Sequence, residues 1–142
     1  MMVPRISGEL AGNYRGIPWE LPNWPDYLRF RDDLAGILDP RFYTIAWLDG
    51  EVWSGRIRLF TGPKSCILVS LKVYPTGLTE CHVEAAAGEL SELVSTTIRR
   101  VEEWAQQQGC STIVIQSREG WLKVMKSSGY SLHQTAIRKE LS

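Results

Sequence analysis

The sequence predicts an α/β (α+β) domain with a mixed sheet, in which an antiparallel meander of strands is followed by a βαβ crossover. Three observations support this fold class. Apolar, β-rich runs separated by short turns fill residues 42–86, a long amphipathic helix pattern starts directly after Gly88, and a short apolar run follows that helix. A strand, a helix and a strand in this order form a parallel crossover. The 142 residues are enough for one hydrophobic core.

The first 25 residues differ in composition from the rest and are expected to form an extended N-terminal arm in front of one domain over residues 26–142. Glycine and proline recur through the arm, which disfavours a helix or a central strand there. Its large aromatic side chains, Tyr14, Trp19 and Trp24, need a surface to cover them. That surface is either this domain or a partner protein, and the sequence leaves both interpretations open.

A helix is expected over residues 26–37, where apolar residues recur at helical spacing after Pro25 and before the Asp39-Pro40 pair. The four strands predicted next cover Phe42–Leu48, Val52–Phe60, Cys66–Tyr74 and Thr79–Ala86. The Asp49-Gly50 pair between the first two runs is typical of a hairpin turn.

The C-terminal half predicts helices and strands in alternation. A long helix begins after Gly88 and is closed by Gly109 as a C-terminal cap. The run Ser111–Gln116 predicts a buried strand beside the one that ends at Ala86. The last expected elements are a short helix over Glu119–Ser128, capped by Ser117, and a strand from Gly129 to about Lys139.

Composition excludes several functional classes. Sixteen basic and sixteen acidic side chains cancel, so binding to nucleic acid through net charge is not expected. No apolar run reaches the ~18 residues of a membrane span, and the N-terminus has no signal-peptide pattern, so we expect neither membrane insertion nor secretion by a signal peptide. The three cysteines lack metal-binding spacing, and His82 and His133 stand far apart, so no metal site is expected.

Several motifs of the C-terminal half resemble small proteins of tailed bacteriophages that have the fold of the N-acetyltransferase (GNAT) superfamily. The motifs are Glu103-Trp104-Ala105, Gly109-Cys110, Arg118-Glu119-Gly120-Trp121-Leu122-Lys123 and Gly129-Tyr130. The resemblance covers about residues 40–140 and implies a GNAT fold, in which a splayed pair of parallel strands holds acyl-CoA. It also implies a phage origin, with other phage proteins as partners and the host cytoplasm or the virion as location.

The resemblance places the CoA-binding loop of active GNAT proteins at residues 85–90. That loop reads Gln or Arg, two residues, glycine, one residue, then glycine or alanine, and its N–H groups and the following helix N-terminus bind the pyrophosphate. If acetyl-CoA binds this chain, the residues around the pyrophosphate are Ala87, Gly88, Glu89, Leu90 and Ser91. Here only one glycine of the motif is present, and Glu89 brings a negative charge that repels phosphate.

The resemblance also locates the proton donor for the departing thiolate, which is a tyrosine four residues before a Gly-aromatic pair. Counting back from Gly129-Tyr130 gives Met125, which has no proton to donate. Arg118, near the start of the short helix, fits two uses equally well. It is either an anion ligand or a guanidinium stacked on Trp121.

The candidate general bases are Glu80 and Glu84. Strand alternation puts both on one face together with His82, and directs Cys81 and Val83 to the other face. A half-solvated strand face produces the same alternation without any catalytic role.

The sequence favours a catalytically degenerate GNAT-fold phage protein that acts through protein–protein contacts, as a structural or accessory component of the virion. The alternative is an active acyl-CoA-dependent N-acetyltransferase, with Glu84 or Glu80 as the base and with water or Tyr130 in place of the missing acid. Regulation of a host protein by binding is a third interpretation. Each is compatible with a homo-oligomer.

Overall fold

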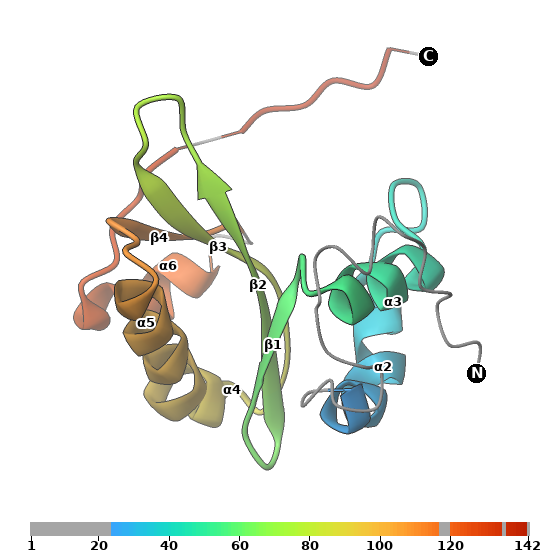
Figure 1. Ribbon diagram of the computed structural model, residues 1–142. Helices are drawn as coiled ribbons and strands as arrows, with labels where there is room; N and C mark the ends of the chain where they lie inside the picture. Colours follow the sequence, from blue (N-terminus) through green and yellow to red (C-terminus); the bar gives the residue numbers. More distant parts are fainter. Residues whose placement is uncertain (1–23, 117–119, 135, 142) are drawn as a thin grey trace.

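A computed structural model describes residues 24–116, 120–134 and 136–141. Its centre is a four-stranded sheet in the order β1-β2-β3-β4, with antiparallel pairing throughout except for the parallel pair β3 and β4. Helices α2 and α3 cover one face of the sheet, and the long helix ending in α5 covers the other together with α6 (Figure 1). The mixed α+β fold class predicted from the sequence is therefore confirmed.

The first described helix, α2, spans Trp24–Ile37 and so begins two residues before the expected start of the domain. The Trp24 ring packs 5.1 Å from the Tyr27 ring and 4.9 Å from the Trp53 ring, within the core under α2 and α3. Of the three aromatic residues assigned to the arm, Trp24 thus packs against its own domain. Tyr14 and Trp19 lie outside the described residues.

Helix α3, Ile45–Ser54, replaces the strand predicted over Phe42–Leu48, and the hairpin expected at Asp49-Gly50 is also wrong. Thr44 caps the helix by accepting a hydrogen bond from the Trp47 N–H. Asp49 is buried, where its carboxylate accepts one bond from the Tyr27 hydroxyl and two from the Arg31 guanidinium. This contact with α2 satisfies Asp49 inside a helix and overrides its turn preference.

The meander contains three strands rather than the four predicted. They are β1 Arg58–Thr61, β2 Ser65–Val73 and β3 Thr79–Gly88. The predicted run Val52–Phe60 is a strand only at its end, because α3 occupies its first residues. The β2–β3 register shifts at Leu68/Val69, where Leu68 pairs with Ala85 and Val69 with Val83. Strand β3 therefore carries one extra residue at this point.

The long helix expected after Gly88 is confirmed and is continuous from Leu90 to Gln107. Its parts are α4 Leu90–Glu92, the π-helical turn Leu93–Thr97 and α5 Ile98–Gln107. Gly109, with φ of 82°, follows the helix in the left-handed conformation expected of a glycine cap. Strand β4, Thr112–Ile115, then pairs in parallel with β3, as predicted.

The chain ends differently from the prediction. Helix α6 spans Gly120–Met125 and is followed by a 3₁₀ turn, Lys126–Ser128, while the predicted cap Ser117 lies outside the described residues. The strand expected from Gly129 to Lys139 is wrong, since residues 130–134 and 136–141 form no strand. The Tyr130 hydroxyl donates to Glu102 on α5, and the described residues after it make no backbone hydrogen bond to the sheet.

Within the described ranges, no helix is both long and apolar enough to cross a membrane.

Candidate functional site

The junction between β3 and α4 contains the residues that the sequence assigned to a CoA loop. Gly88 has φ of 108°, and a Cβ on it would lie 2.6 Å from the Ser65 Cα and closer still to the Lys64 carbonyl oxygen. Only glycine fits so close to the neighbouring backbone. The turn between β1 and β2 therefore packs directly on this junction.

The polar groups of Glu89 at this junction form hydrogen bonds and an ion pair with other residues of the same chain. The Glu89 N–H donates to the Lys64 carbonyl oxygen at 2.9 Å. The Glu89 carboxylate accepts from the Ser91 hydroxyl at 2.7 Å and lies 3.8 Å from the Lys64 ammonium group. The N-terminus of the long helix thus already has an acidic side chain beside it, which its dipole favours.

A second carboxylate, that of Glu92, reaches into the β1–β2 turn. It accepts from the Lys64 N–H at 3.0 Å and from the Ser65 hydroxyl, which also contacts the buried Thr97 hydroxyl at 2.8 Å. Gly62 lies so close that a Cβ there would sit 2.7 Å from a Glu92 oxygen. The Lys64 N–H and the Ser65 hydroxyl of the turn are therefore the donors that join it to the helix start.

The middle of β3 carries a different polar cluster. Glu80 is buried, and its Oε1 accepts from the Tyr74 hydroxyl at 2.7 Å and from His82 Nε2 at 2.8 Å. Its Oε2 accepts from the Thr112 hydroxyl of β4 at 2.6 Å. The bonds from Thr112 and Tyr74 stabilise the ionised form, which lowers the pKa of Glu80 to about 2.

This geometry separates the roles of the predicted bases. A carboxylate with three donors and a low pKa is a weak proton acceptor, but it orients His82. Because Glu80 only accepts, Nε2 of His82 carries the proton of that bond, and the other ring nitrogen has no hydrogen-bond partner in the described chain. Histidine, rather than either glutamate, is the group in this cluster suited to take up a proton.

Glu84 does not join the cluster. The extra residue in β3 lies at this position, since Val83 and Ala85 pair with consecutive residues of β2. Glu84 is exposed and accepts a hydrogen bond from the Ser70 hydroxyl. The structure therefore brings Glu80 and His82 together and leaves Glu84 apart.

Tyr74 and Thr112 are the two site residues that sequence reasoning missed. The β2–β3 register pairs Glu80 with Lys72, and Tyr74 lies two residues beyond Lys72, diagonally opposite Glu80. Thr112 lies opposite Glu80 in the parallel β3–β4 register. Only the strand pairing identifies them.

The positions considered for a general acid are both part of the core on the α5 face. Met125 is buried, and Tyr130 packs in the same cluster. Burial and the hydrogen bond to Glu102 raise the pKa of Tyr130. The hydroxyl proton of Tyr130 is therefore held in the hydrogen bond to Glu102. Arg118 lies outside the described residues.

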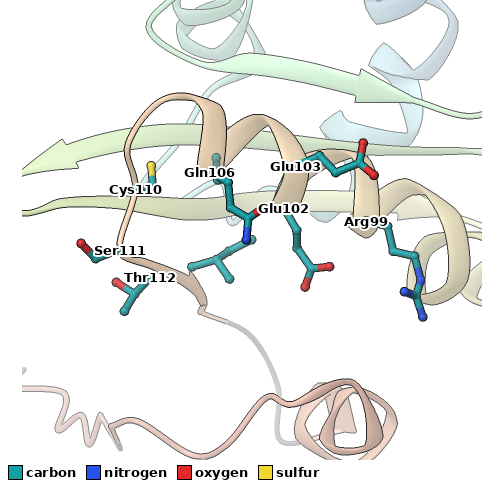
Figure 2. A pocket seen from close by; sticks show the side chains of 9 residues that line it. Arg99, Glu102, Glu103, Gln106, Cys110, Ser111 and Thr112 are labelled. Atoms are coloured by element: carbon teal, nitrogen blue, oxygen red, sulfur yellow. The ribbon is translucent and has the colours of Figure 1, made fainter.

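An open pocket of about 480 Å³ lies between α5 and the start of β4. Figure 2 shows Glu102 and Gln106 pointing from α5 toward the same side as Ser111 and Thr112 of the β4 approach. The pocket is polar at its rim, with Arg99 near the far end of the helix. No motif in the sequence indicated it.

No group of three metal-ligating side chains gathers within the described ranges. His133 lies in the extended C-terminal segment and is exposed.

Comparison with known proteins gives a fold but no close relative. No family model matches the sequence, and no curated protein is significantly similar to it. Among solved structures, a ribosomal-protein-alanine N-acetyltransferase from Brucella melitensis matches with a TM-score of 0.61 and 10% identity, over 85% of this chain and 95% of that one. A predicted acetyltransferase with acetyl-CoA from Clostridium acetobutylicum has a TM-score of 0.60 and 10% identity, over 85% and 92%.

An acetyltransferase from Trypanosoma brucei is similar over 85% of this chain and 94% of its own length, with a TM-score of 0.58 and 15% identity. Identities this low show the architecture alone. The order of the described elements, the parallel β3–β4 pair and these matches lead to one conclusion: the chain has the GNAT acetyltransferase fold.

Proposed function

We propose that this protein is a GNAT-fold protein that acts through protein–protein contacts and does not bind CoA in the pose usual for that fold. One observation carries the proposal. At the β3–α4 junction, the Glu89 N–H and the Glu92 carboxylate are engaged with the β1–β2 turn. A pyrophosphate binds free N–H groups at this place, and that of Glu89 is already bonded to the Lys64 carbonyl oxygen.

Charge supports the same proposal. The carboxylates of Glu89 and Glu92 both lie beside the start of the long helix, and the Lys64 ammonium group lies 3.8 Å from that of Glu89. Two negative charges near a diphosphate make its binding less favourable, especially where an acidic side chain already lies beside the helix N-terminus.

Exposed aromatic side chains support a contact function. Phe42 and Tyr43 are about half exposed, and Tyr43 stacks on the exposed Trp47 with ring centroids 4.9 Å apart. Aromatic residues are enriched in protein–protein interfaces. We expect these residues and the arm residues Tyr14 and Trp19 to contact the partner, while Trp24 serves the core.

The nature of the partner rests on the sequence resemblance to GNAT-like proteins of tailed phages. It supports a role as a virion structural or accessory protein whose partners are other phage proteins. Substituting Trp19 and Trp47 with Ala tests the contact surfaces. We expect loss of co-assembly with the partner at an unchanged melting temperature, whereas unchanged assembly would contradict the proposal.

An acyl-CoA-dependent N-acetyltransferase is the second candidate, and the Glu80–His82 pair favours it. In that reaction Nδ1 of His82 would take the proton of the attacking amine while Glu80 holds the ring through Nε2. The amine nitrogen would bond to the thioester carbonyl, the C–S bond would break, and the thiolate would take a proton from water. Positioning supplies much of the rate of such transfers, so a missing acid does not exclude it.

Calorimetric titration with acetyl-CoA and with CoA separates the two candidates. We expect no heat of binding and no thermal stabilisation up to millimolar ligand. Micromolar binding would overturn the proposal in favour of the enzyme, and loss of acetyl transfer in His82→Gln with binding retained would then identify the base.

A further inference from the structure

Trp53 carries a buried hydrogen-bond donor that the described residues leave without a partner. The side chain lies near the end of α3 and is only 7% exposed, and its indole N–H has no acceptor among the described residues. An unpaired buried donor costs free energy, so nearly all such groups in folded proteins have a partner. We therefore expect an acceptor that lies outside the described residues.

The surface around this donor is apolar, and the neighbouring helices α2 and α3 form it together (Figure 1). Trp24, the first residue of α2, packs edge-on with its ring 4.9 Å from the Trp53 ring and is itself only half-buried. Leu28 lies one turn later on the same helix and is 41% exposed. The α2–α3 surface, defined here as Trp24, Leu28 and Trp53, therefore combines apolar area with one unpaired donor.

The residues that precede α2 have a composition that suits this surface. Residues 17–22 read Ile-Pro-Trp-Glu-Leu-Pro, and the two prolines favour the extended polyproline II conformation. A backbone in that conformation forms no internal hydrogen bonds, so its carbonyl oxygens are free to accept. Proline-rich segments of this kind dock on surfaces lined by aromatic side chains. The segment therefore offers both an acceptor and apolar side chains.

Chain connectivity favours this segment over a separate partner protein as the occupant. Residues 17–22 are joined to Trp24 through Asn23 alone, so they start beside the surface. Six residues in a polyproline II conformation span roughly 19 Å, which is several times the 4.9 Å between the Trp24 and Trp53 rings. A tethered segment also has a high effective concentration at a neighbouring surface, which a free partner lacks.

We infer that residues 17–22 fold back onto the α2–α3 surface of their own chain, and that one of their carbonyl oxygens accepts the Trp53 indole N–H. Three residues per turn put Pro18 and Leu21 on one side of the segment and Trp19 on another. The side with Pro18 and Leu21 packs on the α2–α3 surface, which leaves Trp19 facing outward. The docking does not depend on the proposed function, and only the use of Trp19 by a partner rests on it.

The indole N–H signal of Trp53 in the ¹⁵N-labelled full chain tests the docking, and Trp53→Phe assigns that signal by removing it. We expect Leu21→Asp to speed hydrogen exchange of this N–H about tenfold or more, because the new charge opposes docking and the hydrogen bond is lost. The matched control, Trp19→Asp, adds the same charge on the outward side and should leave the exchange rate unchanged. If neither variant changes the signal, the acceptor is not this segment and the inference is overturned.

A photo-crosslink shows whether the segment docks on its own chain. The photoreactive residue p-benzoylphenylalanine at position 21 should crosslink to a peptide of α2 or α3 within a product of the 16.1 kDa chain mass, whereas the same group at position 19 should not. A product of twice that mass, or no crosslink from position 21, would overturn the inference. Failure of the contact function is distinguishable, since co-assembly would then be unchanged in Trp19→Asp while the crosslink from position 21 still forms.

Discussion

The two regions of β3 that the sequence singled out as functional differ in how they use their polar groups. Just after the C-terminal end of β3, the Glu89 N–H donates to the Lys64 carbonyl oxygen, and the Glu92 carboxylate accepts a hydrogen bond from the neighbouring turn. In the middle of the strand, three donors converge on Glu80 and leave one nitrogen of His82 without a partner in the described chain. In one region the polar groups bond to a turn of the same chain, and in the other they hold the His82 ring in a fixed orientation.

The difference teaches that one strand of this fold can carry an oriented Glu–His pair while the helix start beside its end bonds to a turn of the same chain. Under the proposed function, acetyl transfer would require a bound thioester as well as a base, because a base acts only on a substrate that is held in place. Four changes test the contrast between the two regions.

Gly88→Ala should have the largest effect, because the added methyl meets the backbone of Lys64 and Ser65 at a φ of 108°. We expect a loss of about 3 kcal/mol or more in the free energy of unfolding, measured in urea. Gly77→Ala is the matched control, since it has φ of 89° but nothing within 4 Å, and should cost about 1 kcal/mol. Equal losses for the two variants would show that the junction is not tightly packed.

Acid should destabilise the protein through the Glu80 cluster. The folded-state pKa of Glu80, about 2, lies below the ordinary glutamate pKa of 4.5, so the stabilisation is present above pH 4.5 and is lost as the pH falls toward 2. The loss should be on the order of 2–3 kcal/mol, measured as the difference in unfolding free energy between pH 6 and pH 2. Glu80→Gln should flatten this dependence, and an unchanged pH profile in that variant would mean that other carboxylates cause it.

Glu92→Ala should cost about 1–2 kcal/mol of stability, because the Lys64 N–H and the Ser65 hydroxyl lose a charged acceptor. Thermal denaturation of Glu103→Ala gives the comparison, since Glu103 lies exposed on α5 and should change the free energy of unfolding by less than about 0.5 kcal/mol. If both variants melt alike, the tie between the turn and the helix start contributes little.

Glu89→Gln should have the smallest effect. It removes the charge beside the helix N-terminus but keeps the N–H bond to the Lys64 carbonyl. We expect stability within about 0.5 kcal/mol of the parent protein, and no gain of CoA binding in a calorimetric titration. Micromolar CoA binding by this variant would show that charge alone, rather than the closed backbone, excludes the ligand.

The sequence predicted the elements whose periodicity is local and strong. Strands β2, β3 and β4 and the long helix between the last two follow from alternation and helical spacing, and together they are enough for the fold class. Helix α3 was missed because its residues favour strands, and what stabilises it is the contact of Asp49 with Tyr27 and Arg31 on another helix. Such a contact is not visible in a local pattern.

The candidate site divides in the same way. Alternation along β3 placed Glu80 and His82 on one face, but the extra residue that separates Glu84 depends on the register with β2. The sequence identified Gly88 and the charge of Glu89. It could not show that Lys64, more than twenty residues earlier in the chain, accepts the Glu89 N–H bond, because that contact arises from the packing of two turns.

The most direct test of the account is a titration of isotopically labelled protein with acetyl-CoA, followed through the backbone amide signals of residues 88–91. The closed junction predicts that these signals stay in place up to millimolar ligand, with the Glu89 amide protected from hydrogen exchange throughout. Saturable shifts of the Glu89 and Ser91 amides at micromolar acetyl-CoA would contradict the account and would show that this protein binds acetyl-CoA at the junction.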